Sequence, residues 1–265
     1  MLKTLEAFIY CSNEYDKYSW SGESGTYHNK KEEKGKNGVK FLKKIFVCFQ
    51  KSLFLQNNRN EMNYLNFRNR FIEFGAFSTY QVDAVFQNFS PNNLTRWQQE
   101  GLIVKLRQGF YAFQESILQP NFAFFLSNFI YKPSYVSLHT ALAFYGIIPE
   151  AVTQITAVSS LKTADFQNDV AQFSYKKIKS DLFFGYEQKT LGNRTISIAT
   201  PEKAILDLLY LYPFYNTESE IENLRFDEDF VQNELNIGKL ALYLDRFNNK
   251  KLAKRVEIFT NLYEI

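Results

Sequence analysis

The chain has 265 residues, with 31 Lys and Arg against 28 Asp and Glu, two cysteines and two histidines. This length allows one or two domains, and a chain of this size buries enough surface to need no disulfide or metal for stability. A four-ligand Cys/His zinc site is excluded, because His139 lies far along the chain from the few other candidate ligands.

The first 61 residues differ in composition from the rest. They hold both cysteines, none of the six prolines, and 11 Lys and Arg against 7 acids, a net charge of +4. The remaining residues hold 20 Lys and Arg against 21 acids, a net charge of −1. The mild basicity of the whole chain therefore gives no support to nucleic-acid binding by its main body.

Residues 1–61 form a leader with two parts. The polar composition of 12–40 predicts solvated coil, and apolar residues at helical spacing in 41–55 predict a basic amphipathic helix. That helix is too short and too charged to cross a bilayer, and the N-terminus lacks the pattern of a secretory signal. Three interpretations stay open: a helix that binds a membrane or partner, a disordered tail, or a spurious or dispensable leader ahead of a true start at Met62.

Residues 62–115 predict a small domain of three helices and a hairpin. Helices are expected at 65–74, 79–86 (capped by Ser78) and 90–100, followed by strands at 102–106 and 110–113 around a turn at 107–109. Ser90 and Pro91 suit the start of the third helix, and Gly101 suits the residue after its end. This order predicts a winged helix-turn-helix, with 90–100 as the recognition helix and Arg107 at the tip of the wing.

The third helix is amphipathic, with Leu94 and Trp97 expected to face inward. Asn and Gln side chains bond adenine, Arg bonds guanine, and Lys or Arg on a wing neutralises phosphates. The candidate DNA-binding residues are Asn92, Asn93, Thr95, Arg96, Gln99, Lys105 and Arg107. A solvated helix face and a protein-binding winged helix are the open alternatives.

Residues 116–265 predict a second domain of mixed α and β structure. Helices are expected at 138–146 (capped by Ser137) and 201–210 (capped by Thr200). Strands are expected at 155–159 and 171–178, and a hairpin over 183–199 with a turn at 191–193.

The rest of this domain carries mainly charged patterns. Lys203 and Asp207 are expected to form a surface ion pair on their helix. The acidic stretch 214–236 predicts a solvated connector, and 237–247 predicts a terminal amphipathic helix. The basic segment 250–256 suits DNA, an acidic partner or simple solvation.

Motifs that carry catalysis are missing from the sequence: there is no phosphate-binding loop, dinucleotide fingerprint, nucleophile elbow or zinc helix. His139 is expected to be an ordinary first-turn residue. We therefore expect no enzyme activity, no catalytic residues, no cofactor and no metal.

The order of parts resembles the AbiEi-type antitoxins of type IV toxin–antitoxin systems. The resemblance covers most of 62–265 and rests on the segments 107–113, 135–146 and, above all, Thr-Pro-Glu-Lys-Ala-Ile-Leu-Asp-Leu-Leu at 200–209. It implies a promoter-binding winged helix, and a C-terminal antitoxin domain that counters a nucleotidyltransferase-like toxin with or without direct contact.

The leading expectation is thus a cytoplasmic DNA-binding antitoxin that represses its own operon. We expect it to act in abortive infection and to have no membrane partner. The alternatives are a winged-helix regulator without a toxin, and an enzyme whose site in the β-rich middle would bring together His139, Glu202 or Asp207. The near-neutral body and the single Arg in the recognition helix predict modest DNA affinity or binding by two protomers.

Overall fold

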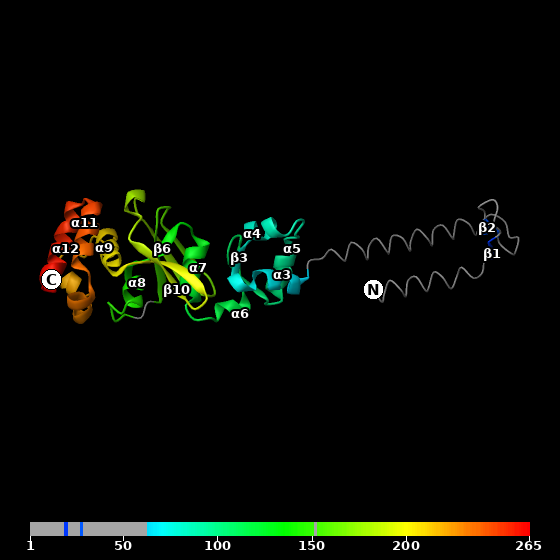
Figure 1. Ribbon diagram of the computed structural model, residues 1–265, viewed down its shortest axis with the longest axis horizontal. Coiled ribbons are helices and arrows are strands. Elements are labelled where there is room, and N and C mark those ends of the chain that lie inside the picture. The colour runs from blue at the N-terminus through cyan, green and yellow to red at the C-terminus, as the bar shows by residue number, and fades with distance from the viewer. Residues whose placement is uncertain (1–18, 21–26, 29–62, 151–152) are drawn as a thin grey trace. The chain divides into compact units, whose positions relative to one another are not determined.

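The computed structural model describes residues 63–150 and 153–265, together with two short strands ahead of them (Figure 1). By its internal contacts the chain divides into two units, Met1–Glu61 and Met62–Ile265. In the first unit β1 (Ser19–Trp20) pairs antiparallel with β2 (Tyr27–His28), inside the stretch for which the sequence predicts coil. The predicted amphipathic helix at 41–55 lies outside the described residues.

The N-terminal module of the second unit, residues 63–117, begins with a helix and places a strand before the next two helices. In chain order it contains α3 (Tyr64–Phe71), η2 (Ile72–Phe74), β3 (Ala76–Ser78), α4 (Thr79–Val85), α5 (Asn92–Gln99), β4 (Ile103–Arg107), β5 (Phe110–Phe113) and α6 (Gln114–Ile117). The strands form an antiparallel sheet in the order β3-β5-β4. The three helices and the hairpin were predicted, whereas β3 was not, because three residues are too few to show an alternating pattern.

Local signals set the ends of these helices. The side chain of Ser78 accepts from the backbone N–H of Gln81, whose own side chain accepts from the N–H of Ser78, so the predicted cap is confirmed as a capping box. Gly101 follows α5 with a φ of +70°. Ser90 is not a side-chain cap: Pro91 occupies the position before α5, and the carbonyl of Ser90 accepts from the N–H of Asn93.

The core of the module is aromatic. Phe67 is fully buried, and its ring lies 4.7 Å from that of Trp97 and 4.9 Å from that of Phe77. Phe71 and Phe113 complete the centre of this cluster. Burying so many large rings gives a module of about fifty residues a substantial hydrophobic core.

The rest of the unit is built on a mixed sheet of six strands in the order β10-β11-β6-β7-β9-β8. The strands are β6 (Ser134–Val136), β7 (Gln154–Ser159), β8 (Ala164–Gln167), β9 (Gln172–Lys177), β10 (Tyr186–Leu191) and β11 (Arg194–Ala199). β6 runs parallel to β11 and β7 parallel to β9, and the other neighbours are antiparallel. The predicted hairpin is confirmed, with Gly192 and Asn193 at its turn.

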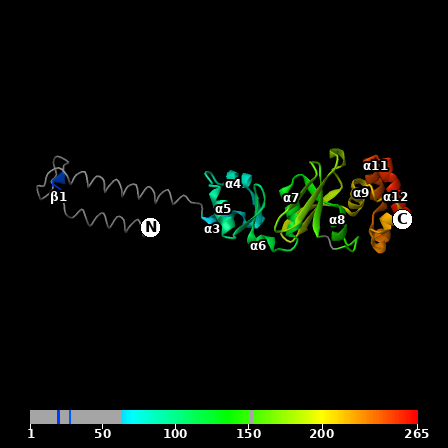
Figure 2. The ribbon, with the colours of Figure 1, turned by 180° about the vertical axis from the view of Figure 1, so that it is seen from behind.

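Helices cover both sides of this sheet. α7 (Phe122–Ile130) packs on Ala157, Phe173 and Tyr175, while α8 (Leu138–Phe144) and α9 (Pro201–Leu211) belong to the cluster that contains Val158. Consecutive residues of a strand point to opposite faces, so Ala157 and Val158 fall into different clusters. Figures 1 and 2 show α7 and α9 on opposite sides of the sheet. The fold class is therefore mixed α+β, as predicted.

The acidic stretch 214–236 is folded, so the prediction of a solvated connector is wrong. It contains α10 (Glu218–Glu222) and η4 (Phe230–Glu234), and its apolar residues Ile221, Phe226 and Val231 are buried. The acidic residues between them lie outward, which gives the stretch its polar composition. The chain closes with α11 (Ile237–Phe247) and α12 (Lys250–Leu262), and the basic segment 250–256 is the first half of α12.

The α7 helix was missed, as were β6 and β8, and a short 3-10 turn, η3 (Ser180–Leu182), precedes β10. α7 is apolar on most sides, which leaves no clear helical period in the sequence. It is buried on one side by the sheet and on another by the N-terminal module, with which Phe122 and Leu126 share a cluster.

Gly75, which links η2 to β3, lies against the sheet domain. Its φ is +72°, and a Cβ built there would collide with the guanidinium of Arg194 and lie 3.0 Å from the ring of Phe122. Arg194 is only 9% exposed and lies over the Phe122 ring at 4.7 Å. Gly75 is thus a point of close approach between the module and the sheet.

We expect Gly75→Ala to destabilise the protein more than Gly146→Ala. Both glycines have a φ of +72°, which costs an L residue about 1–2 kcal/mol, but a Cβ at Gly146 meets nothing within 4 Å. The overlap at Gly75 adds about 1–3 kcal/mol. Urea unfolding of both variants measures the difference, and equal losses would refute a tight contact at Gly75.

Candidate nucleic-acid interface

One face of α5 is exposed and polar, and the opposite face is buried. Asn92, Thr95 and Gln99 are exposed, whereas Leu94 and Trp97 are 4% and 1% exposed. Leu94 and Trp97 share the aromatic cluster of the module, so the outward direction of the polar residues is set by the core beneath them. The sequence predicted these five positions correctly.

Asn93 does not belong to the exposed face. It is 6% exposed, and its Oδ1 accepts a hydrogen bond of 3.2 Å from Nη2 of Arg96. Asn93 precedes Trp97 by four residues, and residues four apart share a face of a helix. This spacing was available in the sequence and places Asn93 on the side of Trp97, so its assignment to the exposed face is wrong.

Arg96 is half-buried on the flank of α5, where its bond to Asn93 orients the guanidinium. Gln98, which was not among the predicted DNA-binding residues, is exposed beside Gln99. The face available to a ligand therefore consists of amides, one hydroxyl and one guanidinium.

The hairpin β4–β5 carries Lys105 and Arg107, and the structure directs them differently. Lys105 is exposed on β4. Arg107 is half-buried: its Nη1 donates to the carbonyl of Ile130 at 3.0 Å, and its guanidinium lies over the ring of Phe166 at 4.3 Å. Arg107 lies at the end of β4 beside the turn, as predicted, but its guanidinium contacts the sheet domain instead of extending from the hairpin toward a phosphate.

We expect Arg107→Ala to lower the free energy of unfolding by about 1.5–3 kcal/mol, because it removes a charge-assisted hydrogen bond and leaves a buried carbonyl without its donor. Lys105→Ala is the matched control and should change stability by less than about 0.5 kcal/mol, as an exposed residue on the same strand. Urea denaturation measures both. If the two variants unfold alike, Arg107 does not secure the hairpin.

The charge of the module is nearly balanced. Residues 62–115 hold five Lys and Arg against four acids, and Arg68 is bound by both oxygens of Glu115 at 2.8 and 2.9 Å. Arg70 is exposed on α3 and was not predicted as a site residue. Electrostatic attraction for a polyanion is therefore weak and local.

Lys203 and Asp207 form a buried ion pair, so the prediction of a surface pair is wrong. Both side chains are fully buried, and Asp207 also accepts hydrogen bonds of 2.9 Å from the hydroxyls of Tyr135 and Ser137. Burial raises the pKa of the Asp207 carboxyl and lowers the pKa of the Lys203 ammonium, and each charge opposes the shift of the other. Helical spacing predicted that the two meet but could not show that the sheet covers them.

The predicted side-chain caps of α8 and α9 are absent. Ser137 precedes α8, but its hydroxyl donates to Asp207 rather than accepting from the helix. Thr200 precedes α9 without a side-chain cap bond, and its hydroxyl is buried. Pro201 does occupy the first turn as predicted, and its missing N–H makes a side-chain cap less necessary.

The enzymatic alternative requires a site that brings together His139, Glu202 or Asp207. In the structure each of these residues contacts different partners. His139 lies 3.4 Å from the hydroxyl of Tyr215, and burial lowers the pKa of its imidazole. Glu202 lies 3.1 Å from the ammonium of Lys239 and accepts from the backbone N–H of Asn236, at the start of α11. Asp207 is enclosed with Lys203. These contacts give each residue a structural role.

The described part of the chain contains no group of three or more His, Cys, Asp or Glu that could hold a metal ion. No helix within that part is long and apolar enough to cross a membrane. In comparisons with known proteins, no family model and no curated protein matches the chain.

Proposed function

We propose that residues 62–115 form a winged helix-turn-helix that binds duplex DNA, with α5 as its recognition helix and β4–β5 as its wing. The order helix, strand, helix, helix, strand, strand and the three-stranded antiparallel sheet support this assignment. In such a module the second helix of the pair enters the major groove, and the first crosses the backbone. In this proposal α5 enters the groove and α4 crosses the backbone.

The observation that carries the proposal is the amphipathic character of α5. Its buried face anchors the helix through Trp97 and Leu94, and its exposed face presents Asn92, Thr95 and Gln99. Asn and Gln amides match the N6 and N7 edge of adenine, and Thr contacts the thymine methyl group. Arg96, oriented by Asn93, supplies a donor pair for guanine.

Phosphate contacts fall to Lys105 on the wing and to the exposed Arg70 on α3, since Arg107 is used inside the protein. Two phosphate contacts for each module give a shallow dependence of affinity on salt. Tight binding then requires two protomers on repeated half-sites, about one helical turn apart.

On the resemblance to the AbiEi family, the protein is an antitoxin and autorepressor of a type IV toxin–antitoxin operon, acting in the cytoplasm against a nucleotidyltransferase-like toxin. Its operator lies upstream of its own gene. The segment most similar to the family, 200–209, forms α9, the central helix of the C-terminal part. Residues 202–209 are buried, so this segment supports a common scaffold, and the antitoxic surface must lie elsewhere on the domain.

We expect Arg96→Ala to weaken binding to the DNA upstream of the gene by about tenfold or more, from the loss of about 1–3 kcal/mol in a base contact. Gln99→Ala, at an exposed position, should relax sequence preference without affecting folding. Arg225→Ala is the matched control, as an exposed arginine on the sheet domain. Mobility shifts at several salt concentrations measure these effects, and unchanged binding by both α5 variants would refute the interface.

The antitoxin role has a separate test. The chain should rescue growth when co-expressed with the neighbouring gene, and rescue should persist with Arg96→Ala if neutralisation does not depend on DNA binding. A chain that shifts its own upstream DNA but has no toxic neighbour is a winged-helix regulator without a toxin partner.

A further inference from the structure

The six-stranded sheet opens at the junction of β6 and β11. These parallel neighbours pair only at Val136 and Ile198. Beyond that pair, the side chain of Asn128 from α7 enters between the strands: its Nδ2 donates to the carbonyl of Ser134 at 3.2 Å, and its Oδ1 accepts from the N–H of Ser197 at 2.8 Å. A carboxamide has two N–H groups and two acceptor positions, so one of each is left for a further partner.

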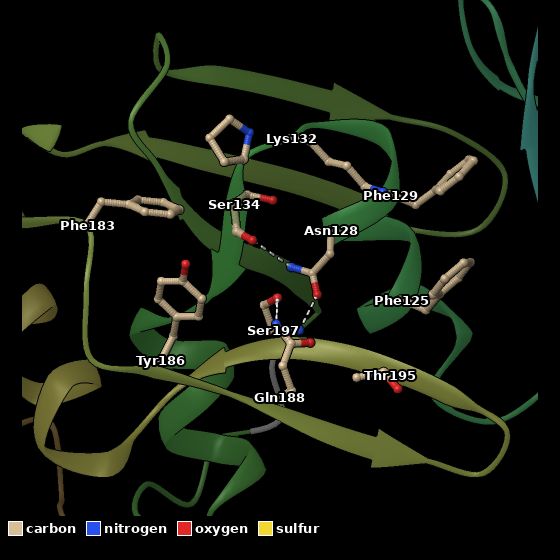
Figure 3. A pocket seen from close by; sticks show the side chains of 11 residues that line it. Phe125, Asn128, Phe129, Lys132, Ser134, Phe183, Tyr186, Gln188, Thr195 and Ser197 are labelled. Carbon is tan, nitrogen blue, oxygen red and sulfur yellow. Dashed lines mark hydrogen bonds between the residues drawn. The ribbon is translucent and has the colours of Figure 1, made fainter. Parts of the chain in front are cut away.

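A pocket of about 350 Å³ lies over this opening, and its two side walls are aromatic (Figure 3). On one side are Phe125 and Phe129 of α7, whose rings stack at 5.7 Å. On the other are Phe183 and Tyr186, with ring centroids 5.3 Å apart. Tyr186 is 39% exposed and rests with one face on Tyr135, so it is held in place while still reaching solvent.

The base of the pocket is polar. Gln188 of β10 lies directly opposite Ser197 of β11 and donates to its hydroxyl at 2.8 Å. Thr195 lies two residues before Ser197 on the same face of its strand. Together with the amide of Asn128, these groups offer both donors and acceptors in the space between the aromatic walls.

Lys132 stands at the rim, exposed, with its ammonium 5.4 Å from the ring of Phe129. It is the only charged residue among those that line the pocket. One cation suits one phosphate, whereas a groove that follows a nucleic-acid backbone carries several.

These features select one class of ligand. A purely apolar molecule would cover the amides and hydroxyls of the base without bonding them, which is unfavourable. A flat ring with a hydrogen-bonding edge stacks on an aromatic side chain of the pocket while its edge bonds the polar groups at the floor. An anion attached to that ring pairs with the ammonium of Lys132 at the rim. A pocket of this volume is at the small end for organic ligands and has room for one such molecule.

The geometry points to a nucleotide site in this pocket: the base stacks on Tyr186, its edge bonds Asn128, Gln188 and Ser197, and its phosphate meets Lys132. The site shares no residue with α5 or with the wing, so it does not depend on the proposed DNA binding. It would give the protein a small-molecule effector in addition to its operator.

The test uses calorimetric titration of the full chain with the four 5′-mononucleotides, adenosine and ribose 5-phosphate. At least one nucleotide should bind, and ribose 5-phosphate at least about tenfold more weakly, because stacking supplies much of the affinity. Tyr186→Leu should weaken nucleotide binding about tenfold, and Lys132→Ala should bring nucleotide and nucleoside affinities together. Tyr80→Leu and Lys179→Ala, at exposed positions outside the pocket, should change neither.

Tyr186→Leu removes a ring that packs on Tyr135, so a loss of binding in that variant could reflect disturbed packing. Gln188→Leu avoids this problem, because Gln188 is exposed and its replacement should leave the fold intact. This variant should lose base discrimination and still shift duplex DNA as the original chain does. The proposal is overturned if no nucleotide binds at millimolar concentration, if ribose 5-phosphate binds as well as the nucleotides, or if Gln188→Leu and Tyr80→Leu behave alike.

Discussion

Lys203→Met should lower the free energy of unfolding by about 3–5 kcal/mol, the usual cost of removing one member of a buried ion pair. The substitution keeps the length of the side chain but leaves the Asp207 carboxylate in a site with no exposure and no cation. The hydroxyls of Tyr135 and Ser137 still donate to it, yet two neutral donors do not replace a full charge. Urea unfolding followed by circular dichroism gives the value.

The double variant Lys203→Met/Asp207→Leu separates two terms in the free energy of unfolding. One is the contribution of the ion pair itself, and the other is the penalty of burying a charge without its partner. The double variant should be less destabilised than Lys203→Met alone, because no buried charge remains. The control pair is Arg225 and Glu150, which lie 2.7 Å apart with side chains 66% and 42% exposed. Arg225→Ala should cost less than about 1 kcal/mol. Equal losses in the buried and exposed pairs would contradict the burial of Lys203.

Phe67→Ala should destabilise the N-terminal module by about 3–5 kcal/mol, as a buried Phe truncated to Ala leaves a large cavity. Its ring lies within 6.2 Å of Phe71 on the same helix, and of Phe77, Trp97 and Phe113, which come from β3, α5 and β5. Because Trp97 anchors α5, the same substitution should abolish the shift of duplex DNA at physiological temperature.

Leu65→Ala is the matched control for Phe67→Ala, since it lies on the same helix and is 60% exposed. It should change stability by less than about 0.5 kcal/mol and leave DNA binding intact. Tryptophan fluorescence reports on the module through Trp97, which with Trp20 is one of the two tryptophans of the chain. Loss of binding without a loss of stability in Phe67→Ala would show that the core does not hold α5 in position.

Much of the N-terminal module could be predicted, because its elements are bounded by local signals. The capping box of Ser78 and Gln81, the glycine after α5 and the spacing of Leu94 and Trp97 each act within a few residues. The hairpin of β10 and β11 was predicted for the same reason, since a Gly-Asn turn joins its strands. Such signals are independent of the rest of the chain.

The site was only partly predictable. Asn93 was misplaced although its spacing to Trp97 gave its position, whereas Arg107 could not have been placed from sequence. Its partners, the carbonyl of Ile130 and the ring of Phe166, come from 23 and more residues further on. The pocket over β6 and β11 was equally hidden, because α7 has no clear period and β6 has only three residues.

The sequence by itself determined the mixed α and β composition, the ends of several helices and the direction of the polar face of α5, because periodicity and capping are local properties of a chain. The tertiary structure decided which of those faces stay exposed. Helical spacing brings Lys203 to Asp207 whether the helix is exposed to water or buried in a core. The pair is buried because α9 packs between the sheet and the helices α11 and α12. Whether a charge is solvated or enclosed depends on elements distant in sequence, and so does the free energy that it contributes.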